Sequence, residues 1–124
     1  MKNIRQINYW TLGGFDGAKP VAQALEETRR MGLDGLELCF GAGCFAPGIR
    51  ESDCAEIRRK AESLGLRIAT LASGAYWGQS LSNPDAAVRK RAVTFTKEYL
   101  QVARWVGAKA VLVVPGAVAV PWDA

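Results

Sequence analysis

The sequence contains no histidine in 124 residues. Imidazole is the side chain whose charge changes near neutral pH, and it is the commonest protein ligand for transition metals. Its absence excludes a Ser-His hydrolase and a zinc site of the usual kind built from this chain alone. Whatever chemistry the chain supports, it supports without an imidazole.

Cysteine is also scarce, with only Cys39, Cys44 and Cys54 present. The number is odd and no two cysteines have the C-x-x-C spacing, which disfavours a disulfide framework and a zinc knuckle. Cys44 is a candidate reactive thiol, but no histidine is available to activate it, so we interpret it as incidental. Unpaired cysteines are typical of a reducing compartment, and we expect a cytoplasmic protein.

Long apolar runs are missing, since none approaches the roughly 18 residues that span a bilayer. The polar residues 1–5 lead into a short strand and do not resemble a signal peptide. We therefore expect no membrane partner. The apolar share of 49% and the charged share of 23% are ordinary for a globular protein.

The excess of positive charge is small, with 16 basic residues against 12 acidic ones. The basic clusters at 29–30, 58–60 and 89–91 lie in predicted helices, so we interpret them as solvated helix faces. A nucleic-acid interface would need a single basic face interleaved with exposed aromatic residues, and we expect none. Attraction of anionic sugar phosphates is left open.

An internal repeat carries the prediction of the fold. Three segments share an apolar residue, a glycine, two linking residues and an apolar run, and they cover residues 31–38, 64–71 and 106–113. A glycine in the left-handed conformation commonly ends a helix, so each repeat predicts a helix end followed at once by a strand. The continuous apolarity of the runs indicates strands that are covered on both faces.

Each of these glycines follows an amphipathic pattern that predicts a helix. The first helix contains Val21–Met31, with Pro20 at its first-turn position. The second contains 57–64 and follows acidic residues that suit a helix start. The third contains Val88–Val106 and opens with the cap sequence of residues 82–85.

Together with a weaker first strand over Ile4–Tyr9, these segments give the order β-α-β-α-β-α-β, which predicts an α/β fold with a parallel sheet and right-handed crossovers. A doubly wound, flavodoxin-like sheet would usually show a glycine-rich phosphate loop, and Gly13–Gly17 does not match G-x-G-x-x-G. A TIM (β/α)8 barrel needs about 250 residues. We therefore expect residues 1–124 to form one domain, the N-terminal half of such a barrel, truncated after its fourth strand and without the helix that follows that strand.

Glu37 is the most unusual residue of the predicted strands, because a carboxylate among apolar neighbours is costly unless it is paired or hydrogen-bonded. The two-residue period of a strand puts Glu37 on the face opposite Leu36 and Leu38. If the leucines meet the helices, Glu37 points into the barrel, where it could bind a sugar hydroxyl or orient another side chain. The alternative is a structural ion pair with a buried arginine or lysine.

Aromatic residues gather where the predicted strands end, which is the functional end of a barrel. Trp10, Trp77 and Trp122 fall in these loops, whereas Trp105 is interpreted as core or helix interface. An aromatic face suits the C–H surface of a sugar ring, and three at one rim favour a pocket, although loop packing could explain any one of them. The glycine-containing segment 40–45 predicts a mobile loop; no Lys-Ser/Thr pair follows it, which disfavours a phosphate cradle.

Three stretches resemble the xylose isomerase-like TIM barrels, and among them the ketose 3-epimerases and related sugar-phosphate isomerases and epimerases. Residues 78–92 resemble the segment that opens their third helix, residues 32–38 their second strand, and residues 107–116 their fourth. The resemblance covers essentially the whole chain. It implies that a divalent ion, typically manganese or magnesium, polarises a ketose carbonyl while two glutamates move a proton through an enediolate-like intermediate.

The metal ligands of this family are usually two glutamates, an aspartate and a histidine from the second half of the barrel. The resemblance therefore implies a Mn or Mg site in the full-length enzyme, with no metal ligand and no catalytic residue in this chain. Only substrate-side positions carry over: Tyr9, Trp10, Glu37, Ser73, Trp77, Pro115 and Gly116. The lack of histidine argues against the endonuclease IV-type repair enzymes, which share the fold and use several.

The leading hypothesis is a part of a metal-dependent isomerase or epimerase that acts on a ketose or sugar phosphate and is inactive as this fragment. The alternative is a non-catalytic module for small-molecule binding or oligomerisation; a flavodoxin-like domain, which would bind flavin, is a third. The open strand edges of a half barrel invite pairing with another chain, so we also expect a homo-oligomer.

Overall fold

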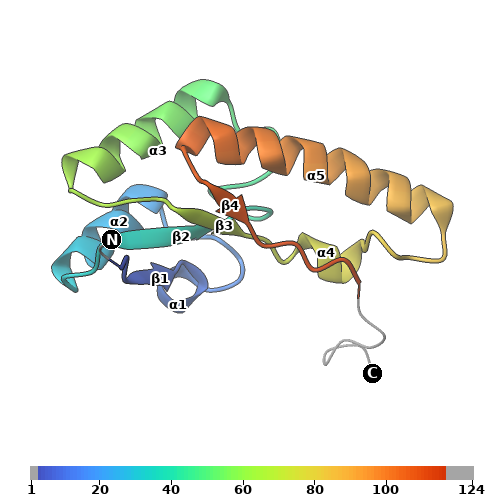
Figure 1. Ribbon diagram of the computed structural model, residues 1–124, viewed down its shortest axis with the longest axis horizontal. Helices are drawn as coiled ribbons and strands as arrows, with labels where there is room; N and C mark the ends of the chain where they lie inside the picture. Colours follow the sequence, from blue (N-terminus) through green and yellow to red (C-terminus); the bar gives the residue numbers. More distant parts are fainter. Residues whose placement is uncertain (1–2, 117–124) are drawn as a thin grey trace.

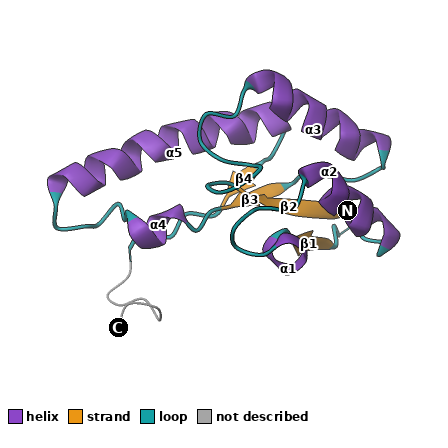
Figure 2. Cartoon of the chain, turned by 180° about the vertical axis from the view of Figure 1, so that it is seen from behind, coloured by secondary structure: helices purple, strands orange, loops and turns teal. Residues whose placement is uncertain are grey.

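Strands and helices alternate along residues 3–116, which are the residues that the computed structural model describes (Figure 1). In chain order the elements are β1 (Gln6–Asn8), α1 (Trp10–Gly13), α2 (Val21–Arg30), β2 (Gly35–Cys39), α3 (Glu51–Ser63), β3 (Thr70–Ala72), α4 (Ala75–Gly78), α5 (Ala86–Val106) and β4 (Ala110–Val111). The long helices α3 and α5 run across the same side of the sheet, as the views from the front and from behind both show (Figures 1 and 2).

The four strands form one sheet in the order β1-β2-β3-β4, and every neighbouring pair is parallel. Asn8 lies opposite Glu37 in the first pair, and Thr70 lies opposite Ala110 in the last. A doubly wound sheet reverses its strand order at a switch point, whereas successive staves of a barrel follow the chain order. The predicted parallel sheet is confirmed, and the order of its described strands is not that of a flavodoxin-like domain.

The glycines of the repeat end the helices as predicted. Gly32, Gly65 and Gly107 have φ angles of 71°, 69° and 84°, which is the left-handed conformation that other residues adopt only at a cost. An added Cβ at Gly32 or Gly65 would meet nothing within 4 Å, so the requirement for glycine there lies in the backbone angle and not in the space.

Helix α5 buries the face that its sequence pattern predicts, including Phe95, Tyr99 and Val102. It begins at Ala86, after Asp85, whose side chain accepts a hydrogen bond from the backbone N–H of Ala87 at 2.8 Å. The helix therefore starts later than residues 82–85 suggest by themselves. No helix among residues 3–116 is long and apolar enough to cross a membrane.

The core lies between the sheet and the helices. Leu36, Leu38 and Leu71 are fully buried there, and Phe40 stacks on Tyr99 of α5 with a ring distance of 5.6 Å. Glu37 is only partly buried between the two leucines of β2, and the two-residue period of the strand places it on the opposite face of the sheet.

Several boundaries differ from the sequence-based expectations. The first strand covers only Gln6–Asn8, because the N–H of Trp10 bonds to the Asn8 side chain at 2.9 Å and starts the helical turn α1. The third strand begins at Thr70, several residues after the predicted apolar run starts, and α4 occupies a segment that we expected to be a loop. Pro20 precedes the first turn of α2, and Met31 follows its end and is 53% exposed.

Candidate functional site

A cavity of about 580 Å³ opens at the carboxyl ends of β1, β2 and β3. In a barrel this is the end of the sheet where ligands bind. The volume falls within the range of about 300–1,000 Å³ that is usual for small-molecule sites. Its lining residues come from the segments after the three strands: Tyr9, Trp10, Phe15, Gly17, Cys39, Phe40, Gly41, Ala42, Gly74, Ala75, Trp77 and Gly78.

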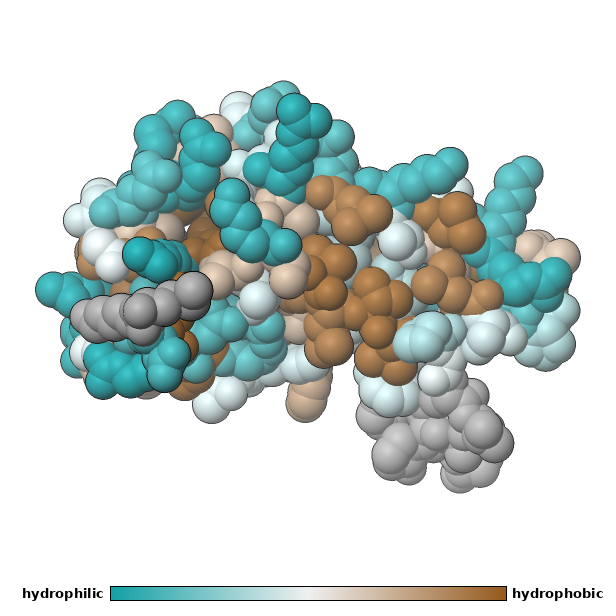
Figure 3. All heavy atoms as spheres, viewed as in Figure 1, coloured by the Kyte–Doolittle hydropathy of each residue, from teal (hydrophilic) through white to brown (hydrophobic). Residues whose placement is uncertain are grey.

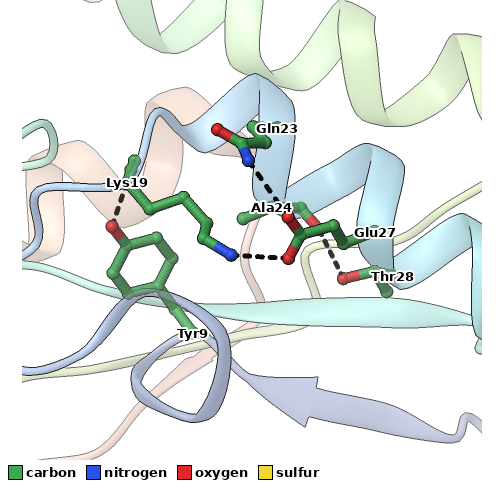
Figure 4. A network of polar contacts seen from close by, with 6 residues as sticks. All are labelled: Tyr9, Lys19, Gln23, Ala24, Glu27 and Thr28. Carbon is green, nitrogen blue, oxygen red and sulfur yellow. Dashed lines mark hydrogen bonds and ion pairs between the residues drawn. The ribbon is translucent and has the colours of Figure 1, made fainter.

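Tyr9 lines the cavity with its ring, whereas its hydroxyl group is bonded to the backbone of Lys19. The side chain is 4% exposed, and its hydroxyl donates a hydrogen bond to the carbonyl oxygen of Lys19 at 2.6 Å (Figure 4). Burial raises the pKa of this phenol. The ring also lies so close to Gly13 that a Cβ there would approach its Cζ to 2.5 Å, which leaves room for glycine only.

An ion pair between Lys19 and Glu27 supports the part of the wall that Tyr9 forms. The Lys19 ammonium lies 2.6 Å from Oε2 of Glu27 on α2, and Gln23 donates to Oε1 of the same carboxylate at 3.2 Å (Figure 4). The side chains of the pair are only 22% and 19% exposed. The hydrogen bond from Lys19 lowers the pKa of Glu27, so this carboxylate stays charged at neutral pH.

Three aromatic side chains form the rest of the wall. Trp10 contacts Phe15 at a ring distance of 5.1 Å, and Trp77 on α4 lines the same cavity. The Trp10 ring lies over the turn after β3, since a Cβ on Gly74 would be 3.4 Å from it. Phe15 is 79% exposed, and the sequence analysis did not single it out. The signal that could have found it is a large apolar residue within a glycine-rich turn after a strand.

Two loops of the wall cross at a pair of glycines. A Cβ on Gly17 would lie 2.4 Å from the carbonyl oxygen of Ala42, and a Cβ on Gly43 would lie 2.2 Å from that of Gly17. The N–H of Cys44 donates to the same Gly17 oxygen at 2.9 Å. The segment 40–45, which we predicted as a mobile loop, is thus held against the segment after β1 by direct backbone contact.

Glu37 lies on the inner face of the sheet, one inward-facing position before Cys39, which borders the cavity. Its Oε1 accepts a hydrogen bond from the Asn8 amide at 2.8 Å, and its Oε2 accepts one from the Thr70 hydroxyl. Thr70 in turn accepts from the Gln6 amide at 2.7 Å. None of the ion pairs within residues 3–116 includes Glu37, so neutral partners on β1 and β3 take the place of the buried arginine or lysine that we considered.

The remaining predicted site residues lie beside the cavity or away from it. Ser73 is 1% exposed, and its hydroxyl accepts from the N–H of Ala75 at 3.2 Å, at the start of α4. Pro115 accepts a backbone hydrogen bond from Ser82 at 3.0 Å, and neither Pro115 nor Gly116 lines the cavity. The structure thus brings Tyr9, Trp10 and Trp77 together. Trp122 lies outside the described residues.

The described part of the cavity wall consists mainly of aromatic side chains, small residues and glycine backbone. No group of three or more histidine, cysteine, aspartate and glutamate side chains among residues 3–116 could hold a metal ion, so this stretch does not by itself fit the metal site of the resembled enzymes. The described residues that line the cavity include no carboxylate. Burial raises the pKa of the Cys39 thiol to about 11, which keeps its sulfur protonated at neutral pH.

Solved structures with the same arrangement are enzymes that contain a longer chain. A D-psicose 3-epimerase in the presence of D-fructose superimposes with a TM-score of 0.71 at 19% identity. The D-psicose 3-epimerase of Clostridium cellulolyticum H10 with D-tagatose gives 0.72 at 20%. In both cases the likeness covers 88% of this chain and 36% of the other, and at this identity it shows the fold alone: four strands of a TIM barrel.

Sequence comparison gives the family. No curated protein sequence matches the chain. Residues 25–124 match the family model described as xylose isomerase-like TIM barrel. That match spans most of the sequence and agrees with the parallel sheet and with the partial TIM barrel that the solved structures share. The chain therefore belongs to the family of xylose isomerase-like TIM barrels.

Proposed function

We propose that this chain forms the sugar-binding wall of an isomerase or epimerase that acts on a ketose or a ketose phosphate. The observation that carries the proposal is the cavity at the carboxyl ends of β1, β2 and β3, with the rings of Trp10, Phe15 and Trp77 around it. Flat aromatic faces complement the C–H surface of a sugar and exclude water from it. Backbone groups of the turn at Gly41 and Gly74 also line the cavity and suit the polar groups of a ligand.

The reaction that we propose is proton transfer next to the ketose carbonyl, through an enediolate-type intermediate. In the family that the sequence resembles, a bound manganese or magnesium ion polarises that carbonyl. Because the described residues that line the cavity include no carboxylate and residues 3–116 hold no metal cluster, we propose that the ion and the proton-transferring groups come from residues other than these. The chain of 124 residues then binds sugar without converting it.

Titration of tryptophan fluorescence with D-fructose, D-tagatose and their phosphates tests the proposal. We expect saturable quenching that Trp77→Ala abolishes, because Trp77 borders the cavity. Trp105→Phe is the matched control, since Trp105 lies on α5 and does not line the cavity. We also expect no epimerisation by the purified chain in the presence of Mn²⁺. Absence of saturable quenching by every ketose would refute sugar binding, and turnover with Mn²⁺ would refute the proposed inactivity.

The second candidate function is a non-catalytic module that binds small molecules or joins chains. It is favoured by apolar side chains that remain exposed on α5 and directly after β4: Val93 at 45% and Leu100 at 52% on α5, and Leu112 at 53% after β4. Figure 3 shows apolar side chains gathered over β4, the chain after it and part of α5. We propose that the open edges of the sheet join copies of the chain. Self-association without ketose binding would favour this function over the first.

We further propose that the protein works in the cytoplasm. Cys39, Cys44 and Cys54 are all free thiols, as a reducing compartment would keep them. Fractionation of cells that express the tagged parent protein tests this: recovery in the secreted fraction would contradict it.

A further inference from the structure

We infer that Asn8 and Glu37 act as a positioning pair that fixes Trp10 in the wall of the cavity. The two residues lie opposite each other on β1 and β2, and neither of them lines the cavity. The inference rests on the proposed function only for the identity of the ligand. The effect on Trp10 itself is a property of the chain that can be measured without any sugar.

Each oxygen of the Glu37 carboxylate accepts a hydrogen bond from a neighbouring strand. Oε1 receives the Asn8 amide N–H at 2.8 Å, and Oε2 receives the Thr70 hydroxyl. The Thr70 oxygen is itself occupied by the Gln6 amide at 2.7 Å. A half-buried carboxylate that has no cationic partner among residues 3–116 depends on such donors, so Glu37 holds the donor ends of its neighbours in place.

The orientation of the Asn8 side chain follows from this. Its NH₂ group must face Glu37, because a carboxylate accepts and cannot donate, and its carbonyl oxygen must therefore face the other way. That oxygen accepts the backbone N–H of Trp10 at 2.9 Å and lies 3.4 Å from the Cys39 sulfur. Glu37 thus fixes the orientation of the Asn8 amide, so that the amide oxygen faces the backbone N–H of Trp10, the first residue of α1.

The bond to the Trp10 N–H determines where the chain leaves β1. The N–H of Tyr9 still bonds to the sheet, at 2.9 Å from the carbonyl oxygen of Glu37, but its backbone angles (φ −54°, ψ −37°) are already helical, and α1 begins at the next residue. The Trp10 ring is thereby laid against Phe15 at 5.1 Å and over the turn at Gly74. A change in the Asn8–Glu37 pair should therefore shift the indole of Trp10 within the cavity.

Each single substitution breaks the pair in a defined way. In Asn8→Asp two carboxylates face each other with no cation between them, which favours a shared proton. In Glu37→Gln the new amide nitrogen must face either the NH₂ of Asn8 or the oxygen of Thr70. In the first case two donors oppose each other, and in the second the Thr70 hydroxyl loses its acceptor.

The double substitution Asn8→Asp with Glu37→Gln restores the bond between positions 8 and 37 with reversed polarity and keeps the direction of the bonds from Thr70 and Trp10. The new amide at position 37 donates to the new carboxylate at position 8 and accepts from the Thr70 hydroxyl. The carboxylate at position 8 still accepts from the Trp10 N–H. The swap leaves net charge and side-chain volumes nearly unchanged, so its recovery would report the hydrogen-bond pattern and not a change of size or charge.

The indole N–H resonance of Trp10 in a ¹H–¹⁵N spectrum is the readout, assigned through Trp10→Phe. At pH 8 we expect this resonance to move in both single variants and to return in the double variant. Near pH 5.5 the Asn8→Asp chain should regain the native resonance, because a protonated carboxyl donates to Glu37 as the amide does.

The titratable groups that face the pair do not disturb this experiment. Among the described residues, the titratable groups that interact electrostatically with Glu37 are Cys39 on β2 and Tyr99 on α5, the latter from the other face of the sheet. Burial raises the pKa of Cys39 to about 11 and also raises that of Tyr99, so both stay neutral up to pH 8. Thr28→Val is the matched control: it removes a fully buried side-chain hydrogen bond, to Ala24, that lies on α2 away from the pair.

In the sugar titration we expect each single variant to bind D-fructose about tenfold more weakly than wild type, with the double variant within about twofold of it. A Trp10 resonance that is unchanged in the single variants, or displaced as far in the double variant as in the singles, would overturn the inference. So would an equal displacement by Thr28→Val. If no variant and no wild-type chain binds D-fructose, the proposed function fails, while the resonances still decide the role of the pair.

Discussion

The Lys19–Glu27 ion pair links the charge of a single carboxylate to the wall of the cavity. Lys19 supplies the carbonyl oxygen that holds the Tyr9 hydroxyl and the ammonium group that holds Glu27 (Figure 4). The pKa of Glu27 is lowered from its ordinary value of 4.5 by this hydrogen bond. A carboxylate whose folded pKa is depressed stabilises the fold at pH values above its unfolded pKa, and this contribution is lost as the pH falls through the folded pKa.

We therefore expect Glu27→Gln to reproduce at neutral pH the change that wild type undergoes in acid. Near-ultraviolet circular dichroism of the tryptophans, followed from pH 7 to about pH 3, is the measurement. Wild type should show a transition below the ordinary pKa of 4.5, and the variant should begin with the altered spectrum. Glu26→Gln is the control, because it removes the same charge from α2 but breaks an exposed bond to Lys60 on α3. Equal effects of the two substitutions would contradict the role of the pair.

At the same scale, the sequence could indicate which residue types belong to the site but not their orientation. The strand period placed Glu37 on the inner face correctly, because burial of Leu36 and Leu38 follows from apolar patterning alone. Its partners could not be predicted, since the bonds to Asn8 and Thr70 depend on the register between strands far apart in the chain. Phe15 was missed because an exposed aromatic residue in a turn has no periodic signal.

Among the elements, the loops that cross at Gly17 and Gly43 hold two parts of the cavity wall together. Both glycines have positive φ angles, of 67° and 59°, and each presses against the backbone of the other loop. Strain from the angle and a clash with the carbonyl oxygen of Gly17 therefore add at Gly43. Gly48 has a φ of 88° in the same connection, but a Cβ there would meet nothing within 4 Å.

This difference makes a matched pair of substitutions. Gly48→Ala should cost about 1–2 kcal/mol of unfolding free energy, which is the penalty of the left-handed conformation alone. Gly43→Ala should cost about 1–3 kcal/mol more, because the two loops must also separate. Urea unfolding of the two variants measures both values. Equal losses would mean that the loops can move apart freely at the crossing.

Helices and strands were predictable to different extents for physical reasons. The long helix α5 has enough turns for its apolar period to identify it, and Gly107, which ends it, can be recognised in the sequence. The four-residue helices α1 and α4 were not predicted, because they are too short to show an apolar period. Each starts at a local hydrogen bond: the N–H of Trp10 donates to the Asn8 side chain, and the N–H of Ala75 donates to the Ser73 side chain. Strand β4 covers only two residues, although its apolar run is longer, because β3 pairs with it over a short stretch.

On the scale of the whole molecule, the sheet of residues 3–116 is an arc of a barrel with two unpaired edges. β1 and β4 each pair with one neighbour only within the described strands. The solved structures that share this arc contain a longer chain, of which this one covers 36%. Leu100 on α5 and Leu112 directly after β4 are exposed, and Figure 3 shows an apolar surface over these parts of the chain. An exposed apolar surface beside an open strand edge favours association with another chain.

We therefore expect the chain of 124 residues to sediment as a dimer or larger species at micromolar concentration. A lysine in place of Leu100 or Leu112 should shift it toward the monomer, because burying a charge in an apolar contact costs more than the contact contributes. Gln101→Lys is the matched control, since it adds the same charge to the exposed side of α5 at a residue that is already polar. Sedimentation velocity across a concentration series measures all three variants. A wild-type chain that remains folded and monomeric throughout the series, or a Gln101→Lys chain that dissociates as readily as the leucine variants, would show that this surface does not join copies of the chain.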